Sequence, residues 1–196
     1  TLRCFAAPSA ADMEPEKEGL QMKILAFDQA TVKTGCAVFE RGRLSSHWLI
    51  DLKRTQNAKE RTARMADEIC RRIETEKLDA VVIEDTAMQT NVSVLRTLAQ
   101  LQGMILGFCF AQGIPCHVRK PSEWRKVLRF RQGRVKSAEL KKQAQALVKT
   151  IYQILVTEDE ADAICIGLAF CLEKRTEDDY DKISKACKGS RRNTAN

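Results

Sequence analysis

The sequence lacks the cysteine and histidine spacings that are typical of zinc-binding domains. None of its eight cysteines forms a Cys-x-x-Cys pair, and only His47 and His117 could join them as ligands. Cys36, Cys109 and Cys165 lie inside apolar segments, where a free thiol behaves as a small buried hydrophobe. This pattern favours a reducing compartment over a disulfide framework, so we expect a cytoplasmic protein.

Long hydrophobic runs, internal repeats and low-complexity tracts are also missing from the sequence. The longest strongly apolar run, residues 104–111, is well short of the ~20 residues that a membrane-spanning helix needs, so we expect no membrane segment. The 196 residues are 30% charged and 44% hydrophobic, which excludes an intrinsically disordered or fibrous chain. We therefore expect one globular domain.

Positive charge is concentrated in one stretch of the chain. Lys and Arg total 33 against 26 Asp and Glu, a net charge of +7, but residues 114–149 alone carry +9. Such a block indicates a polyanionic partner, because each neutralised phosphate releases counterions; an ordinary solvated surface is the alternative. The predicted nucleic-acid contacts are Arg125, Lys126, Arg129, Phe130, Arg131, Arg134, Lys136 and Lys142. Phe130 is the better candidate for base stacking, whereas Trp124 is at least as well explained by core packing.

Hydrophobic patterning predicts three strands followed by an alternation of helices and strands. The first three strands are expected over 24–27, 34–39 and 44–50, as an antiparallel meander. The later elements are expected as a helix over 57–77, a strand over 80–83, a helix over 91–112, a strand over 114–118, and helices over 121–128, 137–155 and 158 to about 172. We expect residues 1–21 to be a disordered or non-native leader, 22–172 the domain, and 173–196 a frayed polar tail.

Carboxylates stand at the ends of three apolar elements. Asp28 and Glu84 each follow a buried strand, and Asp159 and Asp162 lie three residues apart on one face of the last helix. Ligands bind at the carboxyl ends of parallel strands, so these acids could share one site. Taken alone, the helix acids could equally be caps, and Asp28 a turn residue. Oxygen-only ligands select hard cations such as Mg²⁺ or Mn²⁺, and four carboxylates could hold the two ions used in phosphodiester cleavage.

The order and spacing of these motifs resemble the RuvC family of Holliday-junction resolvases in the ribonuclease-H-like superfamily. The resemblance spans residues 22–172 and rests on MKILAFDQATVKTGCAVFE, AVVIEDTAMQTNVSVLRTLAQLQG and DEADAICIGLA. The basic stretch WRKVLRFRQGRVK is closer to phage-type members.

The resemblance carries expectations about fold, activity and site. It implies an α/β fold with a five-stranded mixed sheet, three antiparallel strands then parallel ones, flanked by helices. It also implies a magnesium-dependent, structure-specific endodeoxyribonuclease that binds branched DNA and resolves four-way (Holliday) junctions by paired nicks in recombination or phage DNA processing. The enzyme would be a homodimer without an organic cofactor. The ligands of two Mg²⁺ ions, for which Mn²⁺ would substitute, would be Asp28, Glu84, Asp159 and Asp162. The family's essential lysine best matches Lys141, with Lys142 one step away.

Two alternatives share the same expected fold. A YqgF-type nuclease would process RNA, and a non-cutting binder would keep the fold and the basic stretch without catalysis. An actin-like ATPase or sugar kinase would need a second phosphate loop and a glycine-rich adenosine pocket, and neither is found in the sequence.

Overall fold

The computed structural model describes residues 21–52, 57–86 and 91–190, with only the helical backbone described beyond residue 175. The strands are β1 (Lys23–Asp28), β2 (Lys33–Glu40), β3 (Arg43–Asp51), β4 (Ala80–Glu84) and β5 (Cys116–Arg119). The helices are α1 (Ala58–Thr75), α2 (Val92–Ala111), α3 (Pro121–Val127), α4 (Ser137–Tyr152) and α5 (Glu158–Ser190). The expected leader, residues 1–21, lies almost wholly outside the described residues.

The five strands form one mixed sheet in the order β3-β2-β1-β4-β5. β1 pairs with β2 and β2 pairs with β3 in antiparallel fashion, whereas β1 with β4 and β4 with β5 are parallel pairs. The predicted sheet of three antiparallel strands followed by parallel strands is confirmed. β1 lies at its centre, and its carboxyl end is next to that of β4.

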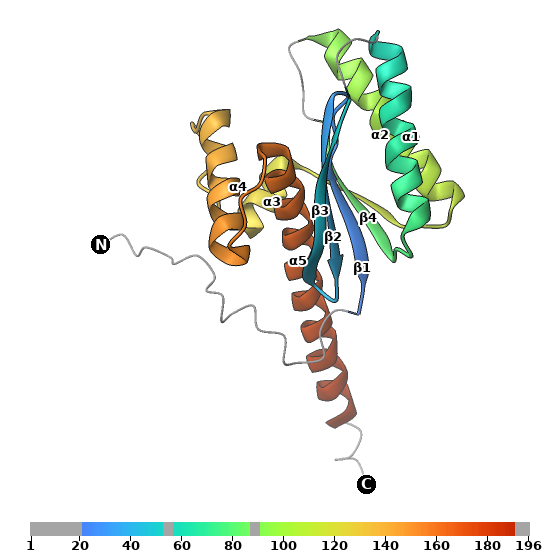
Figure 1. Ribbon diagram of the computed structural model, residues 1–196. Helices are drawn as coiled ribbons and strands as arrows, with labels where there is room; N and C mark the ends of the chain where they lie inside the picture. The colour runs from blue at the N-terminus through green and yellow to red at the C-terminus, as the bar shows by residue number, and fades with distance from the viewer. Residues whose placement is uncertain (1–20, 53–56, 87–90, 191–196) are drawn as a thin grey trace.

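Helices cover both faces of the sheet, with α1 and α2 on one face and α3, α4 and α5 on the other (Figure 1). Alternate residues of β1 point to opposite faces of the sheet. Ile24 and Ala26 pack in the core toward α5, and Leu25 and Phe27 pack in the core toward α1 and α2. All four side chains are fully buried. β1 is therefore apolar on both faces, as its continuous hydrophobic run predicts.

A glycine on β2 allows α5 to approach the sheet closely. Gly35 pairs with Asp28 across β1 and β2. A Cβ atom added to Gly35 would overlap the backbone carbonyl of Asp159, in the first turn of α5. The absence of a side chain at Gly35 thus brings the start of α5 next to the end of β1.

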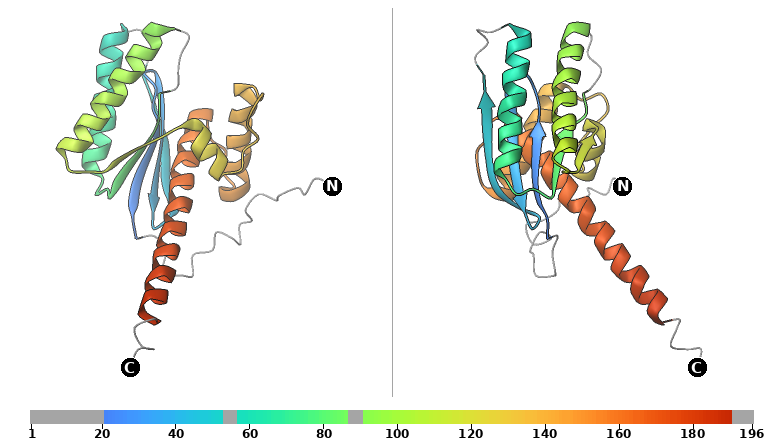
Figure 2. Two further views of the ribbon diagram at one scale, coloured as in Figure 1. Left: turned by 180° about the vertical axis from the view of Figure 1, so that it is seen from behind. Right: turned by 90° about the vertical axis from the view of Figure 1, so that its right-hand side faces the viewer.

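Several elements begin or end at residues other than those predicted, among them β5, α4 and α5. β5 begins at Cys116 rather than at residue 114, and α4 ends at Tyr152 because Gln153 adopts a left-handed conformation that closes the helix. The prediction that the last helix ends near Leu172 is wrong, because α5 continues to Ser190 and extends beyond the sheet (Figure 2). The prediction relied on apolar periodicity, which ends near Leu172, although the helical backbone continues through polar sequence.

Helix α2 exposes a large apolar surface. Leu101, Ile105 and Cys109 are buried, whereas Met104 and Phe110 are exposed, Phe110 to 88%. By length and composition α2 could cross a membrane, which the prediction of no membrane segment did not anticipate. That prediction counted only an uninterrupted run, and α2 is apolar on average although polar residues interrupt it. One such helix is weak evidence for a membrane, and α2 packs beside α1 on the sheet (Figure 2).

Candidate active site

Two acidic side chains lie side by side where β1 and β4 end. The parallel register pairs Phe27 with Ile83, so the next residue of each strand, Asp28 and Glu84, emerges at the same edge of the sheet. This placement agrees with the expectation that the carboxyl ends of adjacent parallel strands form the site.

The first turns of α5 bring two more carboxylates to this edge. Asp159 and Asp162 lie on the face of α5 that approaches the sheet at Gly35, and Asp162 is only 7% exposed. Electrostatic coupling links Asp28 to Glu84, Asp162 and Asp159. The four predicted ligands, which come from three separate segments of the chain, are therefore brought together.

The clustered carboxylates disfavour one another's ionisation. Burial is the main cause that raises the pKa of Asp28 well above its ordinary value, and the charges of Glu84 and Asp162 raise it further. Burial, followed by the charge of Glu84, raises the pKa of Asp162 to about 7. A bound cation would reduce the electrostatic repulsion among these carboxylates. Their donors are all oxygen atoms, which fit a hard divalent ion.

The carboxylates do not close around a metal in this arrangement. In the described part of the chain, no three His, Cys, Asp or Glu side chains are placed to hold one ion. Two of the carboxylates contact other side chains of the protein. Trp124 Nε1 donates a hydrogen bond to Glu84 Oε1 over 2.9 Å, and Lys141 Nζ lies 3.7 Å from Asp159 Oδ1. The donor chemistry therefore fits Mg²⁺, although the described side chains do not surround one ion position.

The other two acids in the first turn of α5 have different partners. Glu160 accepts from the backbone N–H and hydroxyl of Thr157 and lies 2.9 Å from His47 Nδ1 on β3. Glu158 Oε2 forms a 2.9 Å ion pair with Lys141 Nζ. Glu160 thus caps the helix and ties it to β3, as expected for a side chain that points away from Asp159 and Asp162.

Of the two candidate lysines, Lys141 faces the carboxylates. Its ammonium group lies close to Glu158 and Asp159, and hydrogen bonding to Glu158 raises its pKa. Lys142, the next residue of α4, is exposed. The structure therefore places Lys141, and not Lys142, within reach of a phosphate at the carboxylate edge.

Most of the predicted nucleic-acid contacts are exposed and lie on α3, on α4 or on the segment between them. We call these exposed cations the basic rim; it consists of Lys126, Arg129, Arg131, Arg134, Lys136 and Lys142. Arg125 points inward instead, with its guanidinium 4.7 Å from the Trp124 ring and 3.9 Å from Glu84 Oε1. Phe130 is half-buried and packs edge-on against Trp124 at 5.6 Å, so base stacking by Phe130 stays a prediction.

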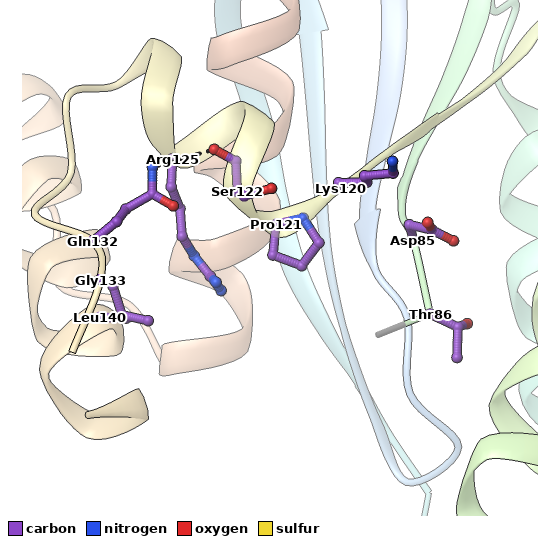
Figure 3. Close-up of a pocket in the computed structure, with 9 residues that line it drawn as sticks. All are labelled: Asp85, Thr86, Lys120, Pro121, Ser122, Arg125, Gln132, Gly133 and Leu140. Atoms are coloured by element: carbon purple, nitrogen blue, oxygen red, sulfur yellow. Dashed lines mark hydrogen bonds between the residues drawn. The ribbon is translucent and has the colours of Figure 1, made fainter. Parts of the chain in front are cut away.

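A cavity of about 470 Å³ adjoins the end of β4 (Figure 3). The side chain of Arg125 points into it from α3, opposite Asp85 and Thr86, which follow Glu84 (Figure 3). Its remaining lining residues are Lys120, Pro121, Ser122, Gln132, Gly133 and Leu140. The cavity thus lies between the residues that follow β4, α3 and the start of α4, and Arg125, which approaches Glu84, is the lining residue that links it to the carboxylates.

Sequence patterns did not identify two side chains that contact Glu84. Gln29 is buried and bonds to the backbone of Glu84, and Trp124 donates to its carboxylate. Gln29 carries no sequence signal of its own apart from its position after Asp28. Trp124 was considered only for core packing or stacking, and it is indeed 2% exposed.

Comparisons with known proteins point to one family. The family described as crossover junction endodeoxyribonuclease RuvC matches residues 24–171. Proteins of that name from Mycobacterium avium and Mycolicibacterium paratuberculosis are each 27% identical over 158 residues, covering 76% of this chain and 81% of theirs.

Solved structures share the fold. The T. thermophilus RuvC in complex with a Holliday junction substrate aligns with a TM-score of 0.65 at 19% identity, over 79% of this chain and 96% of that one. The yeast mitochondrial Holliday junction resolvase aligns with a TM-score of 0.52 at 13% identity, over 80% of each chain. At these identities, the structures establish the fold alone.

Proposed function

The chain belongs to the RuvC family of crossover junction endodeoxyribonucleases, and we propose that it cuts four-way junctions by paired nicks at the carboxylate edge. The observation that carries this assignment of the site is the convergence of Asp28, Glu84, Asp159 and Asp162 from three segments. Burial and mutual repulsion make this cluster costly unless it binds a cation.

The four carboxylates are the proposed ligands of two magnesium ions, with manganese as a substitute. When bound, the ions would supply an activated water and stabilise the leaving oxygen of the phosphodiester. Asp28, at the centre of the cluster, is coupled to the other three acids, which suits a residue shared between two ions.

Basic side chains bind and orient the DNA in this proposal. Lys141 lies beside Asp159 and would place a positive charge against the scissile phosphate, where negative charge develops during cleavage. The basic rim would hold flanking phosphates, since its six exposed cations lie on α3, α4 and the segment between them. Arg125 would act from inside the cavity rather than from the rim.

We further propose that the protein is a homodimer that pairs through α2. Paired nicks in a four-way junction need two active sites related by a two-fold axis. The outer face of α2 is apolar at Met104 and Phe110, and a Cβ atom added to Gly103 or Gly107 would meet nothing within 4 Å. Another α2 helix could therefore approach this face closely.

We propose a cytoplasmic location because the described cysteines are free thiols. The six within the described residues are free thiols, and four of them are buried: Cys36, Cys109, Cys165 and Cys171. Buried free thiols suit a reducing compartment.

The proposal is tested by incubating the protein with labelled four-way junction, replication fork, linear duplex and single-stranded RNA, with Mg²⁺ or with EDTA. We expect Mg²⁺-dependent, symmetrically paired cuts in the junction, and none in EDTA. Faster cutting of RNA than of the junction would favour an RNA-processing nuclease instead. Tight junction binding without any cutting in Mg²⁺ or Mn²⁺ would indicate a non-cutting binder.

A further inference from the structure

The backbone of Glu84 is held by the side chain of Gln29. Glu84 N–H donates to Gln29 Oε1 over 3.2 Å, and Gln29 Nε2 donates to the Glu84 carbonyl. Gln29 is 8% exposed and directly follows Asp28, the last residue of β1. The backbone pairing of β1 with β4 ends at Phe27 and Ile83, so the Gln29 amide continues the ladder by one further step.

The carboxylate of Glu84 is held from the opposite direction by Trp124 on α3. The indole N–H donates to Oε1 over 2.9 Å, and Arg125 Nη2 approaches the same oxygen at 3.9 Å. Trp124 is 2% exposed and packs in the core on the α5 side of the sheet, so its ring has no freedom to move away. Both contacts are made to Oε1, whereas Oε2 makes no hydrogen bond or ion pair within the described residues.

We propose that Gln29 and Trp124 are positioning residues that together fix the distance and orientation of Glu84 relative to Asp28 for metal binding. The inference rests on the proposed function, since it assumes that these two carboxylates bind Mg²⁺. Gln29 sets where the backbone of Glu84 lies, and Trp124 selects which carboxylate oxygen faces the cluster. Neither residue touches the metal.

This arrangement reduces the cost of ordering the site. A glutamate side chain has several rotamers, and fixing it only when the ion arrives would cost conformational entropy. Hydrogen-bond partners of metal-ligating groups typically contribute ~10–100-fold in metal affinity or activity. We therefore expect each positioning residue to act mainly on metal affinity, and much less on DNA binding.

Trp124→Phe tests the carboxylate contact, because it keeps a buried aromatic ring and removes the N–H. The matched control is Trp48→Phe, since Trp48 Nε1 is buried without a hydrogen-bond partner among the described residues. Mg²⁺ affinity of the free protein is measured by calorimetry, and junction affinity is measured in EDTA. We expect Trp124→Phe to weaken Mg²⁺ binding by at least ~10-fold, with junction affinity unchanged and Trp48→Phe like wild type.

Gln29→Met tests the backbone contact, because methionine matches glutamine in length and cannot form the paired hydrogen bonds. Its control is Gln143→Met: Gln143 makes the same paired contact with the backbone of Arg131, far along the chain from Glu84. We expect Gln29→Met to weaken Mg²⁺ binding by at least ~10-fold. Gln143→Met should leave Mg²⁺ affinity unchanged.

Unfolding temperatures in EDTA separate positioning from stability. If Trp124→Phe does not fold, replacing Trp124 by benzothienylalanine, which exchanges only the N–H for sulfur, gives the same test without loss of volume. Wild-type Mg²⁺ affinity in folded Trp124 and Gln29 variants would overturn the positioning role while leaving the proposed function intact. Failure of the wild-type protein to bind Mg²⁺ and to cut junctions would overturn both.

Discussion

At the scale of single residues, the site is a set of buried acids that the protein's own cations neutralise only in part. Lys141 and Arg125 lower the pKa of Asp162, but burial and Glu84 outweigh them and bring it to about 7. Glu158 and Glu160 differ from these acids, since Glu158 is paired with Lys141 and Glu160 with His47. Residues that are adjacent in sequence therefore divide into candidate ligands and structural partners.

Substitutions in the first turn of α5 test this division. Asp159→Asn and Asp162→Asn should each lower the Mg²⁺-dependent cleavage rate by at least ~10²-fold, because each removes a charged ligand. Glu158→Gln and Glu160→Gln should cost less than ~10-fold, since their contacts are to Lys141 and to the helix cap. Single-turnover rates on a four-way junction give the ranking, and the opposite ranking would overturn the assignment of ligands on α5.

The raised pKa of Asp162 leads to a prediction of how the stability of the metal-free protein depends on pH. Its pKa is about 7 in the folded protein against an ordinary 3.8, so the folded state binds this proton more tightly than the unfolded state. Protonation then favours folding, and this contribution is lost as the pH rises from about 4 to about 7. In EDTA, the unfolding temperature should fall across this range more steeply for wild type than for Asp162→Asn. Parallel curves for the two proteins would contradict the shift.

The clustering of the four carboxylates could be predicted from the sequence, and the hydrogen-bond partners of Glu84 could not. Asp28 and Glu84 each follow a run of apolar residues that predicts a buried strand, and this pattern can be recognised in the sequence alone. The partners of Glu84 lie 55 residues away at Gln29 and 40 residues away at Trp124. Their hydrogen bonds depend on which strands are neighbours and on how α3 packs, so no local pattern indicates them.

At the scale of elements, the site depends on the close approach of α5 to the sheet at β2. α5 contacts β1, β2 and β3, and its first turn lies directly over Gly35. β1, β4 and α1 were predictable because the two strands are short continuous apolar runs and the apolar residues of α1 recur every three or four positions. The end of α5 was not predictable in this way, because its last part continues as helix through polar sequence.

Gly35→Ala should move the first turn of α5 away from Asp28. The added Cβ would overlap the backbone of Asp159, which cannot move without shifting the helix. Overpacking of this kind typically costs ~1–3 kcal/mol, so we expect a lower unfolding temperature together with a large loss of Mg²⁺ affinity. Calorimetry on the folded variant measures the unfolding temperature and the Mg²⁺ affinity. Wild-type values for both quantities would show that the close contact of α5 with the sheet at Gly35 is not required.

At the scale of the whole molecule, two surfaces of different chemistry lie on opposite sides of the sheet. The basic rim belongs to the side of α3 and α4, and the exposed apolar face belongs to α2 (Figure 1). DNA and a second subunit could therefore bind without competing for the same side chains.

Dimerisation through α2 is tested by Phe110→Glu, which places a charge on the most exposed apolar side chain of that helix. Sedimentation of the wild type should give twice the 22.1 kDa mass of the chain, and Phe110→Glu should shift the population toward monomer. Leu155→Glu is the matched control, because Leu155 is 84% exposed but lies after α4 on the other side of the sheet. A wild type that is monomeric at micromolar concentration, and binds junctions one to one, would remove the basis for paired cutting.

The most direct test of the account compares cleavage and binding of a four-way junction by Asp28→Asn and wild type in Mg²⁺. Asp28 interacts electrostatically with the other three acids and is not a member of the basic rim. We predict that Asp28→Asn loses Mg²⁺-dependent cutting by at least ~10²-fold while its junction affinity stays close to that of wild type. Retained cutting, or an equal loss of cutting and binding, would contradict the assignment of the active site to this edge of the sheet.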